Sequence, residues 1–122
     1  MKIAENIKGK MNSRCHLNSY KHNKETGSDI YVGYFVDVFR DYIMATPHFF
    51  NVQNENIIDT SLGTKKGLYF GKKVNVKYSS ADKMFDAELW ATLYAEKRIE
   101  NITDLKEICV KYNLKQLNET KI

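Results

Sequence analysis

Apolar side chains are densest between Asp29 and Thr46, and the polar residues among them recur every three or four positions. A helix with this spacing gathers its polar side chains into one narrow stripe and is apolar around most of its circumference. A strand would carry apolar residues on both faces, with Asp37 on the same face as Phe35 and Phe39. The pattern therefore favours a buried central helix over 29–46, although aromatic and β-branched residues lower its helix propensity.

The residues that flank this segment fit the two ends of a helix. Ser28 is a suitable N-cap, and Pro47 cannot continue a helix. If other elements wrap around the helix, its large side chains are buried and form a scaffold rather than a binding or catalytic site. This expectation covers Tyr34, Phe35, Val38, Phe39 and Tyr42.

Between Asn56 and Tyr78 the pattern changes to short apolar runs that are separated by glycine-containing breaks. Such breaks are typical of hairpin turns, and the last run alternates apolar and polar residues as a half-buried strand does. The segment predicts a three-stranded antiparallel meander with one buried face. Its strands are expected at Ile57–Leu62, Leu68–Phe70 and Val74–Tyr78.

Two helices are expected near the C-terminus. Ser79 or Ser80 caps the first of them, over 81–100. Asn101 or Thr103 opens the second, whose apolar residues follow the i, i+3, i+4, i+7 rule up to a left-handed stop at Asn113. The apolar residues of this last helix are Leu105, Ile108, Cys109 and Tyr112.

The other segments carry weaker patterns. Residues 2–12 have helical spacing that Gly9 weakens, residues 13–28 predict an exposed loop, and residues 116–122 predict a frayed tail. No linker or repeat interrupts the 122 residues, so they are expected to form a single α+β domain. Its elements are the buried central helix, the antiparallel β-meander and the two C-terminal helices.

Composition and charge narrow the classes of function. The net charge is +4, and lysine dominates the basic side because only Arg14, Arg40 and Arg98 are arginines. Lysine gives general attraction to anions, whereas bidentate recognition of bases or phosphates favours arginine. The sequence shows no secretory signal and no apolar run near the roughly 20 residues that a membrane span needs. A cytoplasmic protein without a membrane partner is expected.

Lysines gather in the expected meander, where no acidic residue lies between Asp59 and Asp82. Lysines beside aromatic rings can neutralise phosphates while the rings stack on bases. Acidic residues gather instead in 29–59 and 82–100, and such separation of sign favours oriented docking to a charged partner. The candidate binding residues are Lys65, Lys66, Tyr69, Lys72, Lys73 and Lys77.

Histidines and cysteines offer a third kind of candidate site. No C-x₂-C pair is present, and Cys15-His16-x₅-His22 is a poor substitute for a zinc knuckle, so no metal and no cofactor is expected. Cys109 falls at a core position of the last helix and is expected to pack as a small hydrophobe. Cys15 with His16 or His22 could supply a nucleophile and a base, which makes a small enzyme one of the alternatives.

Together these patterns favour a small non-enzymatic binding protein that engages a nucleic-acid-processing protein or complex. Lysine- and asparagine-rich domains of this kind resemble phage or mobile-element inhibitors of host defence. Direct, non-specific nucleic-acid binding through the lysine-rich meander is the first alternative, and an enzyme that uses Cys15, His16 or His22 is the second. Exposed aromatic residues or a free sheet edge also leave a homodimer open.

Overall fold

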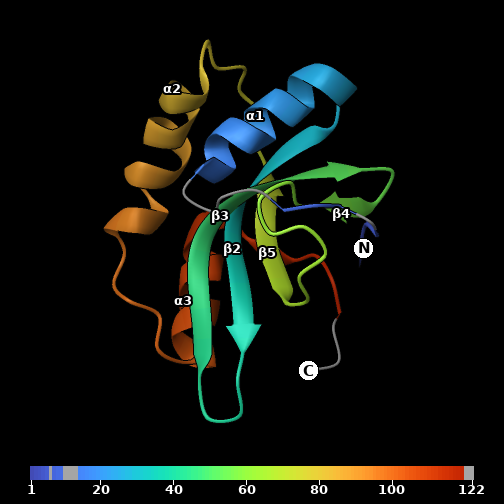
Figure 1. Cartoon of the computed structure of the whole chain (residues 1–122). Helices are drawn as coiled ribbons and strands as arrows, with labels where there is room; N and C mark the ends of the chain where they lie inside the picture. The colour runs from blue at the N-terminus through green and yellow to red at the C-terminus, as the bar shows by residue number, and fades with distance from the viewer. Residues whose placement is uncertain (6, 10–13, 120–122) are drawn as a thin grey trace.

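A computed structural model gives the structure of the chain and describes residues 1–5, 7–9 and 14–119. These residues form a six-stranded sheet with helices around it (Figure 1), so the predicted mixture of helices and strands is confirmed. The strand order across the sheet is β1-β4-β3-β2-β5-β6. The strands are β1 (Lys2–Ile3), β2 (Asp29–Val38), β3 (Ile43–Gln53), β4 (Asn56–Ile58), β5 (Leu68–Lys73) and β6 (Lys115–Gln116).

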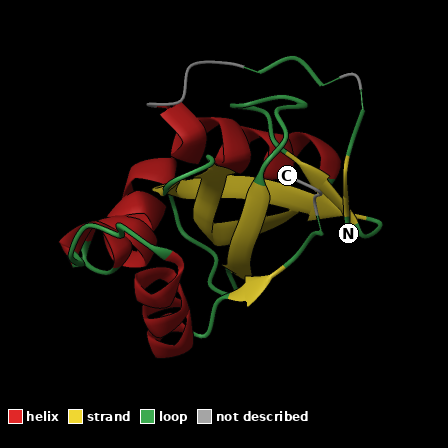
Figure 2. Cartoon of the chain, turned by 90° about the horizontal axis from the view of Figure 1, so that it is seen from below, coloured by secondary structure: helices red, strands yellow, loops and turns green. Residues whose placement is uncertain are grey.

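The helices wrap around the sheet on two of its sides, and loops occupy the rest (Figure 2). Helix α1 packs against β3 and α2. One cluster of buried side chains lies between the sheet and the helices, and a second lies on the opposite face, around Phe35, Phe50 and Tyr69. The helical elements are α1 (Cys15–Thr26), α2 (Ala81–Phe85), the π-helical turn η2 (Asp86–Trp90), the 3₁₀ turn η3 (Leu93–Ala95) and α3 (Ile102–Tyr112).

The predicted central helix over 29–46 is wrong, because this segment forms β2 and the first part of β3. The two strands pair antiparallel along their length, with Asp29 opposite Val52 and Val38 opposite Ile43. Strand β2 also pairs with β5 and has a buried cluster on each face, so it is apolar on both faces without being a helix. Its β-branched and aromatic residues favour this conformation.

Pro47 does not end a helix but lies inside β3, opposite Tyr34 of β2. Strand β4 covers β3 only at Asn51–Gln53, so among the described residues β3 has an open edge on that side at Pro47. At such an edge a missing N–H is tolerated.

The burial expected for the segment's large side chains holds only in part. Tyr34 and Phe35 are 2% and 3% exposed, as predicted. Phe39 and Tyr42 are 43% and 57% exposed, because they lie at the turn between β2 and β3 rather than on a helix. Their rings stack on each other with centroids 4.7 Å apart. Val38 is partly buried.

The predicted three-stranded meander is also wrong. Strand β4 pairs with β3 and β1, whereas β5 pairs with β2 and β6, so the two are not neighbours in the sheet. Residues 74–78 form no strand, although the Val74 amide donates to the Ile30 carbonyl at 2.8 Å. The alternation and the glycine breaks mark extended chain and turns, but they do not encode which strands pair over a long sequence separation.

The C-terminal helices are closer to their predictions. The Ser80 hydroxyl caps α2 by accepting from the Lys83 amide, but the expected helix over 81–100 is broken into α2, η2 and η3. Helix α3 is confirmed: the Asn101 side chain caps its start, and Asn113 ends it in the left-handed region with φ 57°.

The predicted exposed loop over 13–28 contains helix α1, which ends at Gly27 with φ 75°. This helix is hard to recognise because its buried residues are Cys15 and Ser19 rather than large hydrophobes. Of the tail expected to fray, Asn118 is 5% exposed, and its side chain bonds the Gly67 carbonyl and the Tyr69 amide. Residues 120–122 lie outside the described residues.

The short helix expected over 2–12 is not supported where the chain is described. Residues Lys2–Ile3 form β1, which pairs parallel with β4, and residues 6 and 10–12 lie outside the described residues. Among the described helices, none is long and apolar enough to cross a membrane.

Candidate functional site

A buried ion pair between His48 and Asp59 lies at the centre of the candidate site. His48 is on β3 and Asp59 follows β4, and the His48 Nε2 is 2.8 Å from the Asp59 Oδ2. The two residues are 3% and 1% exposed. The His48 ring lies beside the rings of Phe35 and Phe50, on the face of the sheet that holds the second cluster. A charged pair in such an apolar setting is costly unless its hydrogen bonds are complete.

The Asp59 carboxylate has those hydrogen bonds. Its Oδ2 also accepts from the Tyr69 hydroxyl at 2.6 Å, and its Oδ1 accepts from the amides of Ser61 and Leu62 at 3.0 and 2.9 Å. Burial alone would raise the pKa of Asp59. The hydrogen bond and the charge of His48, together with the hydrogen bonds from the Tyr69 hydroxyl and the Leu62 amide, lower it by more, so the pKa of Asp59 lies below its usual value. The carboxylate is therefore ionised and fixed in one orientation.

Cys15 approaches the other side of the His48 ring. Its thiol lies close enough to the ring to raise the pKa of His48, while the Nε2 atom of the ring faces Asp59. Burial lowers the pKa of His48, but hydrogen bonds and charge interactions with Asp59 and Cys15 raise it more, to about 9. His48 is therefore an imidazolium at neutral pH. In space, the Cys15 thiol, the His48 imidazole and the Asp59 carboxylate follow one another in the order of a nucleophile, a base and the group that orients the base.

The position of Cys15 in α1 adds to this arrangement. Cys15 is the first residue of the helix, and Arg14, at the N-cap, makes no side-chain cap hydrogen bond. The first turn contains no acidic residue. Amides in the first turn of a helix lack intrahelical partners, and the helix dipole places positive charge there. Negative charge that develops at or beside the sulfur is stabilised in this position.

Cys109 provides a comparison within the same protein. It is 6% exposed, close to the 8% of Cys15. It lies on α3 in the apolar cluster under the helices, where burial raises its pKa to about 11. The two cysteines are equally covered and belong to the same buried cluster, but Cys15 differs in lying at a helix N-terminus near His48. As predicted, Cys109 is buried among apolar side chains.

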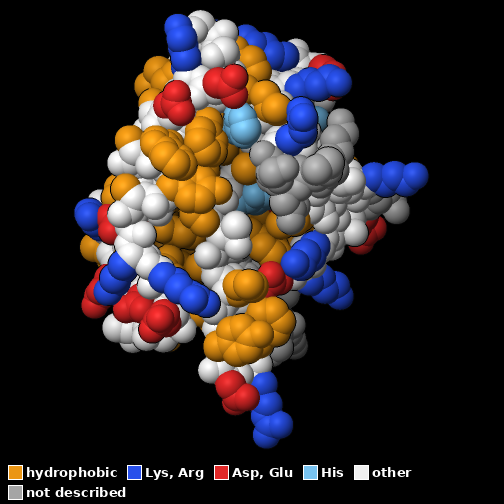
Figure 3. Space-filling view, turned by 60° about the vertical axis from the view of Figure 1, so that its left-hand side comes forward, with side chains coloured by type: hydrophobic (Ala, Val, Ile, Leu, Met, Phe, Trp, Pro, Cys, Tyr) orange, Lys and Arg blue, Asp and Glu red, His pale blue; other side chains and the backbone are white. Residues whose placement is uncertain are grey.

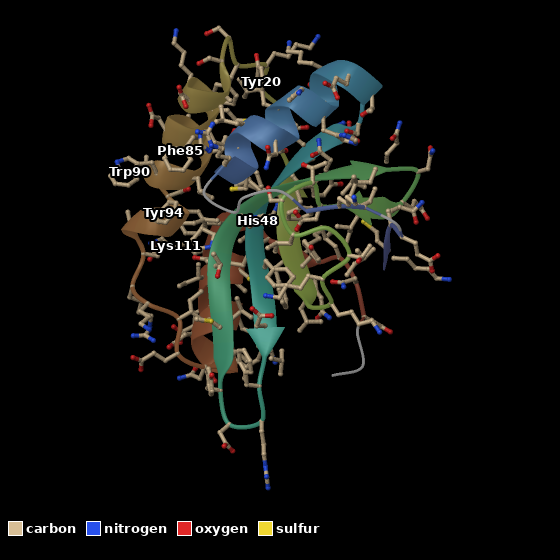
Figure 4. All side chains as sticks on the ribbon, viewed as in Figure 1. Tyr20, His48, Phe85, Trp90, Tyr94 and Lys111 are labelled. Carbon is tan, nitrogen blue, oxygen red and sulfur yellow. The ribbon has the colours of Figure 1, made fainter. Side chains whose placement is uncertain are left out.

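An exposed group of aromatic side chains lies beside the N-terminus of α1. We call Phe85, Trp90 and Tyr94 the aromatic patch; they come from α2, η2 and η3, and their ring centroids are 5.8 to 6.2 Å apart. Trp90 is 62% exposed and Tyr94 is 50% exposed. In Figure 3 hydrophobic side chains gather on this side of the molecule next to histidine, and Figure 4 shows the three labelled rings along one flank, with His48 further inside.

The six candidate binding residues do not form one surface. Tyr69 is fully buried against Asp59, so its expected role in stacking on bases is wrong. Lys65 and Lys73 pair with Asp37 and Asp29 at 3.2 and 3.4 Å. Lys72 and Lys73 are adjacent in β5 and project to opposite faces of the sheet. Lys66 and Lys77 are exposed in loops on either side of β5.

The structure joins Cys15 to a histidine other than the two that sequence reasoning paired with it. His16 bonds the Asp82 carboxylate at 3.2 Å, and His22 lies two helical turns beyond Cys15 on α1. His48 and Asp59 were missed as site residues because their partners are distant in sequence. The available signal was a histidine in the apolar run 47–52 and an aspartate that directly follows another apolar run.

Comparisons with known proteins give no further guide: no protein-family model, no curated protein and no solved structure matches the chain. The side chains of residues 1–5, 7–9 and 14–119 include no group of three or more histidine, cysteine and acidic residues placed to hold a metal ion. The geometry around Cys15 and His48 is therefore the main guide to function.

Proposed function

We propose that the protein is a cysteine-dependent enzyme that transfers or hydrolyses an acyl group. Cys15 is the nucleophile, His48 is the general acid and base, and Asp59 orients the His48 ring. Tyr69 holds the Asp59 carboxylate through its hydroxyl. The observation that carries this proposal is a thiol at a helix N-terminus near an imidazolium whose Nε2 is fixed by a buried carboxylate.

The reaction proceeds in two steps that these residues can support. The Cys15 sulfur attacks the carbonyl carbon of an amide, ester or thioester, and the carbonyl electrons move to the oxygen beside the first amides of α1. The intermediate collapses, the bond to the leaving group breaks, and His48 gives its proton to that group. Water or another acceptor then attacks the thioester, gives its proton to His48 and releases the Cys15 thiolate.

A purely structural role for the ion pair is the competing explanation. A buried His–Asp pair can hold a loop in place without any chemistry. That role does not need a cysteine near the histidine ring, and it does not need that cysteine to be the first residue of a helix. The two explanations therefore differ in what they predict for the thiol.

Alkylation by iodoacetamide, followed by mass spectrometry of the native protein, tests the proposal. Cys15 is expected to react at least tenfold faster than Cys109, although both are equally covered, because its thiol lies at a helix N-terminus near the imidazolium of His48. His48→Gln is expected to slow Cys15 without changing Cys109, with circular dichroism as the control for folding. If Cys15 and Cys109 react at similar rates in the unmutated protein, the proposal is wrong.

Binding without catalysis remains the second candidate function. It is favoured by exposed apolar side chains at the β2–β3 turn: Phe39, Tyr42 and Met44 are 43%, 57% and 53% exposed. On this proposal the turn engages a nucleic-acid-processing protein or complex. A pull-down with and without nuclease, comparing the unmutated chain with a Phe39→Ser/Tyr42→Ser variant, tests it. A partner that depends on these rings and survives nuclease supports it, and recovery of the same proteins by both chains refutes it.

A further inference from the structure

The aromatic patch begins at the residue next to the nucleophile. His16 directly follows Cys15, its ring centroid is 4.9 Å from that of Phe85, and its Nε2 bonds the Asp82 carboxylate. The first turn of α1 is thereby tied to α2. Phe85 also packs against the buried cluster that contains Cys15. A group bound on the patch is consequently held beside the sulfur.

The shape of the patch leaves ring surface for a ligand. The Trp90 and Tyr94 rings are inclined at 48° to each other, and Phe85 and Trp90 at 33°, so the rings do not cover one another's faces. More than half of Trp90 is exposed, which is unusual for so large an apolar side chain that has no task at the surface. Aromatic rings arranged in this way gain both buried area and ring–ring contacts when another ring enters.

The charges at the edge of the patch limit which ligand group can bind there. Asp82 is paired with His16, and Lys83 and Asp86 lie nearby on the same turns with opposite signs. Glu88 accepts a hydrogen bond from the Tyr78 hydroxyl at 2.7 Å and so has a partner within the protein. The edge therefore carries more negative than positive charge, which disfavours an anionic side chain.

Resting on the proposed function, we infer that the acyl substrate carries an aromatic or bulky apolar side chain, which binds to Phe85, Trp90 and Tyr94 while Cys15 attacks the neighbouring carbonyl. The patch then determines specificity rather than the chemistry itself. Binding of the side chain places the carbonyl carbon at the sulfur, so the benefit is expected in kcat/KM for substrates that have this group.

Two p-nitrophenyl esters with the same leaving group test this inference. N-acetylphenylalanine and N-acetylglycine esters are compared by the release of p-nitrophenol, and the rate of the Cys15→Ala variant is subtracted to remove reaction at other groups. We expect kcat/KM for the phenylalanine ester to be at least tenfold higher. Trp90→Ala is expected to reduce this preference to less than threefold, and Val110→Ala, which changes an apolar side chain that is 82% exposed on α3, is expected to keep it.

The outcomes separate this inference from the proposed function. If Cys15 is alkylated rapidly but both esters react equally, or if Trp90→Ala keeps the preference, the aromatic patch does not bind the substrate and only this inference fails. A higher rate with an N-acetyllysine ester than with the phenylalanine ester also overturns it. If Cys15 is inert to iodoacetamide and to both esters, the proposed function itself fails.

Discussion

Removing the Tyr69 hydroxyl tests the buried array without removing any ring from the core. In Tyr69→Phe the ring keeps its contacts with Phe35 and Phe50, whose centroids are 5.1 and 4.9 Å away. The only interaction lost is the 2.6 Å hydrogen bond to Asp59. Because the acceptor is ionised and both residues are buried, this bond belongs to the stronger class, worth roughly 1.5–3 kcal/mol.

The expected loss lies near the middle of that range. Asp59 keeps its bonds to His48, Ser61 and Leu62, so the substitution does not leave a carboxylate oxygen without a partner. We therefore expect Tyr69→Phe to lower the free energy of unfolding by about 2 kcal/mol. With a urea m-value of about 1–3 kcal/mol/M, the midpoint falls by roughly 1 M.

Urea denaturation followed by circular dichroism measures this change, provided that the transition is two-state. Tyr42→Phe is the matched control, because the same atom is removed from a tyrosine that is 57% exposed and a change within about 0.5 kcal/mol is expected. A loss below about 0.5 kcal/mol for Tyr69→Phe as well would show that the hydroxyl does not support a buried carboxylate, and the electrostatic account of the site would be wrong.

Two further predictions concern charge. His48 has its pKa raised from 6.5 to about 9, so the stability that it contributes is fully present below pH 6.5 and is lost as the pH rises through 9. Urea unfolding at a series of pH values should show the free energy of unfolding fall by roughly 3 kcal/mol over this window. A free energy that does not change with pH, or the same pH dependence in His48→Gln, would contradict the prediction. Changing Lys65, Lys66, Lys72 and Lys73 to Glu is expected to abolish any weak affinity for DNA that falls with added salt, as measured by fluorescence anisotropy; affinity that survives the change excludes direct binding through these lysines.

Local signals in the sequence identified several elements correctly. Asn101, Asn113 and Ser80 are cap residues whose effect depends on the backbone within three or four positions, and each caps its helix as expected or as one of two expected choices. The burial of Tyr34 and Phe35 was also predicted correctly, because these rings are covered whether the buried segment is a helix or a strand. What sequence reasoning could predict was therefore the local boundary and the density of apolar residues.

The errors come from contacts between distant segments. A strand that is buried on both faces has no alternation, so β2 resembled a helix until its neighbours β3 and β5 were known. The same holds for the candidate site, where Cys15 and His48 are brought together only by the packing of α1 on β3. Pairing Cys15 with His16 or His22 followed from proximity in sequence, which does not give side-chain geometry.

The origin of the array in four separate segments has a consequence for the life of the chain. Cys15, His48, Asp59 and Tyr69 meet only after the β2–β3 hairpin has formed and the chain has closed the longer connection to β5. Closing such connections costs entropy that local structure does not repay, so this step comes late in folding. During synthesis the sulfur emerges from the ribosome well before its partners do, and it comes near His48 only when the sheet has formed. The rate at which Cys15 reacts with a thiol reagent therefore reports when the last stage of folding is complete.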